Sequence, residues 1–280
     1  MKRKISIIGG DLRIVNLARL LANDGFEVYA YGMENASFLT EVTMLESLEE
    51  TIEKSNIIVS GVPLSQDGIN INLPYSEKKI SIMELKKMLK DKIFIAGKIP
   101  DEIKSDNTIE FYDLLQIEEY AILNAIATAE GAIQIAMEEY PKTLSGSNIL
   151  IMGFGRIGKI LAKMLQGIGA NVFCEARKNA DLAYIKAYGY NAVNLIDLDE
   201  NLSQYDIIIN NIPTMILDKD KLNKVKKDAL IIDLASKPGG VDFEYAKQKK
   251  INTIWALALP GKVAPISAAE YIRDIIYNII

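Results

Sequence analysis

The sequence of 280 residues contains no histidine, the side chain that most often transfers protons near neutral pH. This absence excludes Ser-His-Asp triads and metal sites built on histidine. We expect no metal ion, and any acid–base chemistry must use lysine, aspartate, glutamate, tyrosine or water.

Cysteine and long apolar runs are also scarce. The single cysteine, Cys174, excludes an internal disulfide framework and a cysteine-rich metal site, and we interpret it as a small core residue. Apolar runs stay shorter than the roughly 20 residues that span a bilayer, and no signal-peptide core follows the first residues. We therefore expect a cytoplasmic protein without a membrane partner.

Long basic runs are missing as well, and the net charge of −5 results from 32 Lys+Arg against 37 Asp+Glu. This balance argues against nucleic acid as a main partner. The chain does contain 49% hydrophobic residues, enough for buried cores, and its length suggests about two domains.

One stretch, residues 148–158, runs from an apolar strand into three glycines with the spacing Gly-x-Gly-x-x-Gly. Gly153 permits a tight turn, Gly155 lets the backbone approach a pyrophosphate, and Gly158 lets the next helix pack close to the strand. Apolar residues at helical spacing follow, and a second strand is expected at 171–175. The stretch predicts a dinucleotide site; the alternative is a strand–helix turn without a ligand.

The N-terminal half alternates strands with helices in the same way, which predicts a mostly parallel, doubly wound sheet. Its expected strands are 4–8, 27–31, 57–60 and 93–96, and its expected helices are 12–23 and 81–89. At a constant offset of 144 residues Gly9 aligns with Gly153 and Leu17 with Leu161, so the halves look like two copies of one α/β layout.

The first copy carries Asp11 and Ile14 where the second has glycines. A carboxylate at Asp11 disfavours an approaching pyrophosphate, so we expect the cofactor in the second copy and the substrate in the first. The alternative for the first loop is a plain turn in which Asp11 caps a helix.

The sequence thus predicts two Rossmann-like doubly wound domains with a cleft between them. Residues 1–120 form the substrate domain and 145–265 the cofactor domain, and a proline-free helix at 113–140 joins them. The apolar helix at 266–280 is expected to return to the first domain or to the connecting helix, as core or as a dimer face. We expect a homo-oligomer.

The end of the second cofactor-domain strand selects between NAD and NADP, because an acidic residue there binds the ribose 2′-hydroxyl of NAD. That position falls on Ala176, and Arg177 and Lys178 follow as ligands for the 2′-phosphate of NADP. This favours NADP; the alternative, NAD, applies if Glu175 takes the ribose position.

Later strand ends at 210–213 and 233–240 should line the nicotinamide half, because ligands of open α/β sheets bind beyond the carboxyl ends of strands. The alternative is that Pro213 and Pro238 only end strands. The predicted cofactor contacts are Gly153, Gly155, Arg156, Ile157, Gly158, Ala176, Arg177, Lys178, Asn211, Ile212, Pro213, Ala235 and Ser236.

The segment 260–267 holds Lys262 between two prolines, which predicts a rigid loop that aims its ammonium group. Lys98 follows the analogous strand end in the first half. We expect both lysines to take part in catalysis and to bind a substrate with carboxylates. The other predicted substrate contacts are Asp11, Arg13 and Ser60, and the unassigned candidates for proton transfer are Tyr112 and Asp233.

Four motifs resemble those of the dipicolinate synthase A-subunit family of spore-forming bacteria. They are Gly-Gly-Asp-x-Arg at 9–13, Gly-Val-Pro-Leu-Ser-x-Asp-Gly at 61–68, the glycine motif at 153–158, and Ala-Leu-Pro-Gly-Lys-Val-Ala-Pro at 258–265. The resemblance implies an NAD(P)-linked oxidation of dihydrodipicolinate or hydroxy-tetrahydrodipicolinate to pyridine-2,6-dicarboxylate. It also implies a flavoprotein-like partner, the B-subunit of dipicolinate synthase, and a location in the mother cell of a sporulating bacterium.

Two other functions stay open. The tail Pro-Gly-x-Val-x-Pro-Ile-Ser at 260–267 is also similar to the end of methylenetetrahydrofolate dehydrogenases, which share two α/β domains and NADP, although the lysine motif of that family has no match in the first half. The other is a redox sensor that binds NAD(P)H without turnover, and the chain offers no basic DNA-binding helix to support it.

Overall fold

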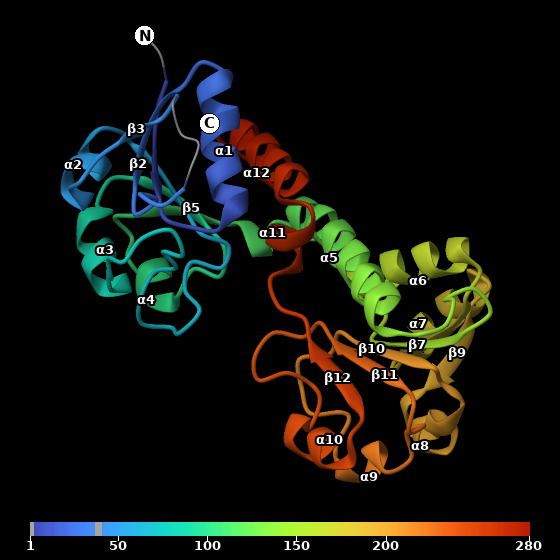
Figure 1. Ribbon diagram of the computed structural model, residues 1–280. Helices are drawn as coiled ribbons and strands as arrows, with labels where there is room; N and C mark the ends of the chain where they lie inside the picture. Colours follow the sequence, from blue (N-terminus) through green and yellow to red (C-terminus); the bar gives the residue numbers. More distant parts are fainter. Residues whose placement is uncertain (1–2, 37–40) are drawn as a thin grey trace. The chain divides into compact units, whose positions relative to one another are not determined.

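The computed structural model describes residues 3–36 and 41–280 and divides into two compact units. The first unit contains the chain up to Asn124 together with Ala264–Ile280, and the second contains Ala125–Val263. Each unit is built on its own parallel sheet with helices packed against it (Figure 1).

The sheet of the first unit has the strand order β3-β2-β1-β4-β5-β6, and its paired strands are parallel. Its strands are β1 (Lys4–Ile8), β2 (Glu27–Tyr31), β3 (Thr43–Met44), β4 (Ile57–Ser60), β5 (Ile93–Ala96) and β6 (Glu110–Asp113). The order reverses between β1 and β4, so the loops that follow these two strands lie at the switch point where such sheets bind ligands.

The sheet of the second unit has the order β9-β8-β7-β10-β11-β12, again with parallel pairs. Its strands are β7 (Asn148–Met152), β8 (Asn171–Ala176), β9 (Asn191–Asn194), β10 (Ile207–Asn210), β11 (Leu230–Asp233) and β12 (Asn252–Trp255). Counted from its own first strand, this sheet has the topology of the first one. The prediction of two Rossmann-like α/β domains is confirmed.

Both sheets are covered on both faces, which explains why their strands are almost continuously apolar. In β1, Ile5 and Ile7 join the core cluster that contains α1, whereas Ile8 joins the cluster on the opposite face. Every residue of β10 and β11 is buried. Each fully buried isoleucine side chain contributes about 1.5–3 kcal/mol of hydrophobic free energy, so these central strands anchor the loops at their ends.

Helices complete the two units. Those of the first unit are α1 (Leu12–Asn23), α2 (Leu48–Glu53), α3 (Ile82–Met88), α4 (Asp101–Lys104) and α12 (Pro265–Ile279), with the 3-10 turn η1 (Leu114–Gln116). Those of the second unit are α6 (Arg156–Ile168), α7 (Asn179–Ala187), α8 (Leu198–Asn201), α9 (Lys219–Leu222), α10 (Phe243–Lys249) and α11 (Leu259–Val263), with the 3-10 turns η2 (Leu195–Asp197) and η3 (Leu202–Gln204).

The helix predicted at 113–140 is shorter than expected. Asp113 ends β6, because the chain still pairs with β5 there, and the helix α5 (Glu118–Glu139) begins after η1. Tyr120 is buried in the first core and Ala132 in the second, so α5 belongs to both units. Its length and composition would also allow it to cross a membrane, a test that core helices of soluble proteins pass as well.

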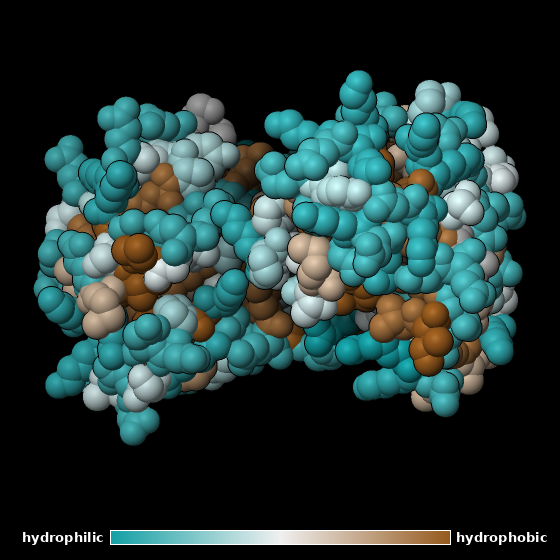
Figure 2. All heavy atoms as spheres, turned by 90° about the horizontal axis from the view of Figure 1, so that it is seen from below, coloured by the Kyte–Doolittle hydropathy of each residue, from teal (hydrophilic) through white to brown (hydrophobic). Residues whose placement is uncertain are grey.

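The C-terminal helix α12 packs along α1, as Figure 1 shows. Ile272 and Ile276 of α12 lie in one core cluster with Leu17 and Leu21 of α1. The chain therefore returns to the first unit after Val263. Solvent-facing apolar residues are spread over several elements, and the face drawn in Figure 2 is mostly hydrophilic with separate hydrophobic patches.

Two isoleucines of α12 provide a matched test of this packing, since Ile272 is fully buried and Ile266 is 59% exposed. We expect Ile272→Ala to lower the free energy of unfolding by about 2–5 kcal/mol, because it leaves a cavity against α1. The control, Ile266→Ala, should change it by about 0.5 kcal/mol or less. Urea unfolding measures both values, and equal effects would mean that α12 does not pack on α1.

Candidate functional site

The glycine turn between β7 and α6 has the geometry that a dinucleotide requires. Gly153 has a φ of 90°, a left-handed conformation that favours glycine. A Cβ atom added to Gly158 would lie 2.1 Å from the carbonyl oxygen of Gly153, so only glycine lets α6 approach β7 this closely. A Cβ atom added to Gly155 would meet no described atom within 4 Å.

Gly155 is also the N-cap of α6, and as a glycine it forms no side-chain cap hydrogen bond. The cap residue therefore supplies no acceptor for the first turn of α6, where the helix dipole favours a negatively charged ligand. Arg156 and Ile157 form the first helical positions, the former exposed and the latter half-buried. The open space at Gly155 and the uncapped helix together fit the pyrophosphate of a dinucleotide.

The loop after β10 closes over this turn. The side-chain amide of Asn211 donates a hydrogen bond of 2.9 Å to the carbonyl oxygen of Gly153, and its carboxamide oxygen lies beside the Gly153 Cα. Ile212 is half-buried and Pro213 is exposed. Asn211 thus holds the glycine turn in position, while Ile212 and Pro213 form the adjoining surface.

The loop after β11 is organised by Asp233, which is fully buried. Its carboxylate accepts hydrogen bonds from the Asn210 side chain (2.8 Å), the Ala235 backbone (3.0 Å) and the Gly240 backbone (2.8 Å). We therefore assign Asp233 a structural role instead of proton transfer. Ala235 is buried in this loop, and Ser236 is exposed at its tip.

The acidic and basic residues at the end of β8 differ in exposure. Arg177 and Lys178 are exposed directly after the buried Ala176, where a 2′-phosphate ligand is expected. The Glu175 carboxylate is fully buried and accepts a hydrogen bond of 3.1 Å from the Gly153 backbone N–H. This inward position speaks against the alternative in which Glu175 binds the ribose. Cys174 is buried as predicted, and burial raises its pKa to about 12.

Burial also raises the pKa of Glu175, although the Gly153 N–H and the Arg177 charge act in the opposite direction. The second carboxylate oxygen, Oε1, is buried without a hydrogen-bond partner among the described residues. The low-polarity surroundings of Glu175 thus disfavour its charged form relative to an exposed glutamate.

The corresponding turn of the first unit is closed by its own side chains. Asp11 is the N-cap of α1 and accepts a hydrogen bond from the Arg13 backbone N–H. The Arg13 guanidinium forms an ion pair of 2.7 Å with the same carboxylate and donates to the Val62 carbonyl oxygen. Only 3% of the Arg13 side chain is exposed. The helix-capping alternative describes Asp11 correctly, and Arg13 is a buried structural partner instead of the predicted substrate ligand.

Two further candidates in the first unit have structural partners. Ser60 is buried, and its hydroxyl donates a hydrogen bond of 2.7 Å to the Ile8 carbonyl oxygen, so it ties β4 to β1 instead of contacting substrate. The Tyr112 hydroxyl donates to Glu110 at 2.8 Å, and this contact raises the pKa of Tyr112. A raised phenol pKa does not favour Tyr112 as a base.

The two predicted lysines are both exposed. Lys98 lies two residues after the last residue of β5, at the carboxyl edge of the first sheet. Lys262 lies in the short helix α11, which corrects the prediction of a rigid loop around it. Leu259 and Val263, one turn apart on that helix, pack against Gly131 of α5, where an added Cβ atom would lie 3.0 Å from each side chain.

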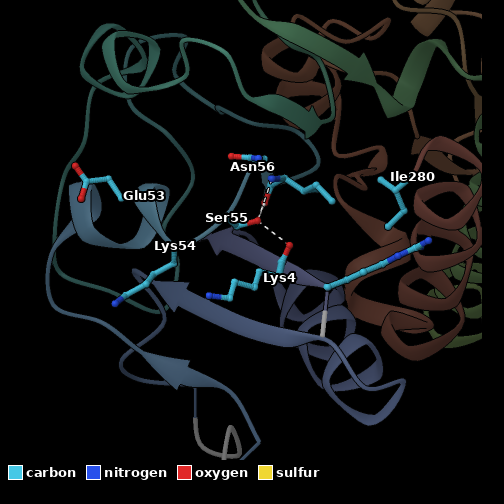
Figure 3. Close-up of a pocket in the computed structure, with 8 residues that line it drawn as sticks. Lys4, Glu53, Lys54, Ser55, Asn56 and Ile280 are labelled. Atoms are coloured by element: carbon cyan, nitrogen blue, oxygen red, sulfur yellow. Dashed lines mark hydrogen bonds between the residues drawn. The ribbon is translucent and has the colours of Figure 1, made fainter. Parts of the chain in front are cut away.

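A surface pocket of the first unit lies elsewhere. It is lined by Lys4, Lys54, Ser55 and Asn56, with the C-terminal Ile280 beside them, and the Ser55 hydroxyl donates to the Lys4 carbonyl oxygen (Figure 3). These residues are at the amino ends of β1 and β4, the opposite end of these strands from the loops at the switch point. The pocket therefore does not belong to the candidate site.

Comparisons with known proteins relate both units to families. Residues 4–115 match the N-terminal domain of the dipicolinate synthase A-subunit. Residues 127–238 match the NAD binding domain of D-isomer specific 2-hydroxyacid dehydrogenases. The N-terminal match agrees with the resemblance found in the sequence motifs.

Whole-chain relatives give the same result. The dipicolinate synthase A-subunit of Bacillus subtilis (strain 168) is 29% identical over 99% of this chain and 95% of the relative. The crystal structure of the dipicolinate synthase A-subunit from Bacillus halodurans superposes with a TM-score of 0.87 at 26% identity, covering 99% of this chain and 97% of that one. Shikimate dehydrogenase (NADP(+)) of Methanococcus maripaludis is 29% identical over 70% of each chain.

Two glycines of one turn should respond differently to the same substitution. Gly155→Ala should change the free energy of unfolding by about 1 kcal/mol or less, because its Cβ atom enters open space, yet weaken NADPH binding about tenfold or more. Gly158→Ala should lower the free energy of unfolding by about 1–3 kcal/mol, because its Cβ atom meets the Gly153 carbonyl. Urea unfolding and NADPH fluorescence titration measure the two effects. Unchanged NADPH affinity in Gly155→Ala would contradict the pyrophosphate assignment.

The buried Glu175 carboxyl should make stability depend on pH. Because its pKa is raised above the ordinary 4.5, the folded state binds this proton more tightly than the unfolded state, and stability falls as pH rises from the ordinary value toward the folded pKa. Glu175→Gln removes the ionisation while keeping an acceptor for Gly153. Its stability relative to the wild type should therefore be higher at pH 8 than at pH 5, by chemical unfolding at both pH values. Parallel pH profiles for the two proteins would refute a raised pKa at this position.

Proposed function

We propose, starting from the homology of this chain to the dipicolinate synthase A-subunit over its whole length, that it oxidises dihydrodipicolinate or its hydroxy-tetrahydro precursor to pyridine-2,6-dicarboxylate. The chain is an NAD(P)-dependent oxidoreductase, since its second unit carries the NAD-binding domain of a dehydrogenase family. The observation that carries the proposal is the uncapped glycine turn of α6, within a chain of which 99% aligns with the synthase relative.

NADP is the proposed form of the cofactor. The exposed cations Arg177 and Lys178 follow Ala176, a residue that brings no carboxylate to repel a 2′-phosphate. The nearest carboxyl on β8, Glu175, is turned inward and its pKa is raised. A relative that aligns with 70% of the chain is a shikimate dehydrogenase whose name specifies NADP(+). The bound cofactor would supply a nicotinamide ring that accepts a hydride.

Lys98 of the first unit and Lys262 of the second are the proposed ligands of the substrate carboxylates. Both side chains are exposed, and Lys98 follows a strand end at the carboxyl edge of its sheet. An ammonium group binds a carboxylate through charge-assisted hydrogen bonds. Arg13, Asp11 and Ser60 are left out, because their side chains are engaged inside the first unit.

The proposed chemistry needs little proton-transfer machinery. Oxidation of the dihydro compound removes one hydride, which goes to the nicotinamide, and one proton, which goes to water or a nearby base. The hydroxy-tetrahydro form first loses one water molecule. Because the product ring is aromatic, its formation provides driving force. A chain without histidine can therefore perform this reaction with binding and orientation as its main contributions.

The B-subunit of dipicolinate synthase is the proposed partner, because the name of the relative identifies that protein as the A-subunit of a synthase. We further propose a cytoplasmic location in the mother cell of a sporulating bacterium, and a homo-oligomer of this chain within the complex. Size measurement of the purified chain, alone and mixed with the B-subunit, tests both associations.

The overall proposal is tested with freshly generated hydroxy-tetrahydrodipicolinate and the full chain, alone and mixed with the B-subunit. We expect dipicolinate absorbance to appear together with one equivalent of NADPH. Tight NADPH binding without either product would favour a redox sensor, and the dehydrogenase proposal would be wrong. Turnover of methylenetetrahydrofolate would support the alternative family.

Arg177→Ala should reveal the cofactor preference. Loss of a charge-assisted contact to the 2′-phosphate should weaken NADPH binding about 10- to 100-fold and leave NADH affinity nearly unchanged. Lys186→Ala is the control, because it removes an exposed positive charge from α7 of the same unit. Both dissociation constants are measured by fluorescence titration. A parallel loss of NADPH and NADH affinity in Arg177→Ala would contradict the 2′-phosphate contact.

A further inference from the structure

Lys98 has an unusual backbone for a residue with a side chain. Its φ is 54°, in the left-handed region that favours glycine, and it directly follows Gly97 at the end of β5. Such a conformation persists only where the surrounding structure holds it, and it often occurs at functional positions. The contacts around Lys98 identify what holds it.

Asp113, at the end of the neighbouring strand β6, binds the backbone on both sides of this position. Its Oδ1 atom accepts from the Lys98 N–H at 2.9 Å, and its Oδ2 atom accepts from the Ile99 N–H at 3.1 Å. Oδ1 also accepts from the Leu115 N–H at 3.2 Å. Only 5% of Asp113 is exposed, and its carboxylate accepts from three backbone N–H groups.

The loop after β4 also binds the backbone at the end of β5. The Gly97 N–H donates to the Gly61 carbonyl oxygen at 3.0 Å, and the Leu64 N–H donates to the Gly97 carbonyl oxygen at 2.7 Å. A Cβ atom added to Gly97 would lie 2.5 Å from the Val62 side chain, so the loop after β4 packs directly against Gly97. The backbone at 97–99 is therefore clamped between the 61–64 loop and Asp113.

Lys104 balances the charge of the clamp. Its ammonium group lies 2.9 Å from Asp113 Oδ2, and 21% of its side chain is exposed. Lys98 itself is exposed, so the carboxylate binds the backbone of Lys98 and the side chain of a different lysine. Asp113 thus holds the backbone of Lys98, while its ion pair is formed with Lys104.

We propose that Asp113 is a positioning residue, which holds the left-handed backbone of Lys98 so that the lysine presents its ammonium group at the carboxyl edge of the first sheet. The clamp itself is independent of the reaction. The benefit to the substrate rests on the proposed function, in which Lys98 binds a carboxylate. Two experiments separate these parts.

The first experiment measures hydrogen exchange of the Lys98 and Ile99 amides in the ligand-free protein. Both amides should be protected in the wild type, and Asp113→Asn should increase their exchange about tenfold or more, because it weakens the acceptor. Lys104→Gln should leave them nearly unchanged, since it removes only the ion pair. Unprotected Lys98 and Ile99 amides in the wild type would overturn the clamp, whether or not Asp113→Asn folds.

The second experiment is a double-mutant cycle on the affinity for pyridine-2,6-dicarboxylate, measured by calorimetry with NADP bound. Lys98→Gln and Asp113→Asn should each weaken binding about tenfold, and the double variant should be no weaker than either one. Asp106→Asn is the control, because it removes a half-buried carboxylate of the same unit that contacts Thr108 and Lys86.

The outcomes distinguish the inference from the proposed function. A loss of about a hundredfold in the double variant would mean that the two residues act independently, and the positioning role would be wrong. Wild-type affinity in Lys98→Gln would remove the proposed carboxylate contact and the positioning role with it. The overall oxidation would still be judged separately, by dipicolinate and NADPH formation in the wild type.

Discussion

The N–H groups in the first turn of a helix need acceptors, and the two units meet this need in opposite ways. The N-cap residues Asp11 and Gly155 have nearly the same backbone conformation, with φ of −82° in both and ψ of −169° and −160°. In the first unit the Asp11 carboxylate supplies the acceptor. In the second unit the cap has no side chain, and the acceptor must come from elsewhere. The same turn is thus capped by its own side chain in the first unit, whereas in the second unit it fits an anionic ligand.

Buried carboxylates organise the carboxyl edges of both sheets. Asp113 and Asp233 each collect backbone N–H groups from a loop, and Glu175 accepts the N–H of the first motif glycine. Asp113 and Asp233 each order a segment that carries a candidate functional residue, because several hydrogen bonds to one carboxylate restrict a loop strongly, whereas Glu175 contributes one such bond. Candidate ligands of the site are therefore positioned by acidic residues that do not themselves face solvent.

Much of the fold could be predicted from sequence, because parallel sheets impose simple patterns. The expected strands 4–8 and 27–31 and the helix 12–23 coincide with β1, β2 and α1, since apolar runs and an N-cap aspartate mark them directly. The end of the connecting helix was harder to predict. Residues 110–113 contain Phe and Tyr between two acidic residues, and pairing with β5 decides that they form a strand.

The candidate site was less predictable, because the roles of its polar residues depend on contacts between distant segments. Nothing local indicates that Asp113 binds the backbone after β5, or that Ser60 bonds to Ile8. The helix α11 likewise packs closely against Gly131, more than a hundred residues earlier in the chain. The glycine motif was predictable since its function requires the absence of side chains, which the sequence displays directly.

The two cations expected to bind substrate in the first unit illustrate the same limit. Arg13 and Lys98 both follow strand ends, but a buried guanidinium is costly unless a carboxylate pairs with it, and Asp11 lies two residues away to do so. The spacing Asp-x-Arg could have indicated this pairing. Lys98 has no acidic residue at that spacing, and the carboxylate that reaches it binds its backbone instead. The exposed ammonium group of Lys98 therefore stays a candidate for binding a ligand. The planar guanidinium of Arg13 instead pairs with Asp11 inside the first unit.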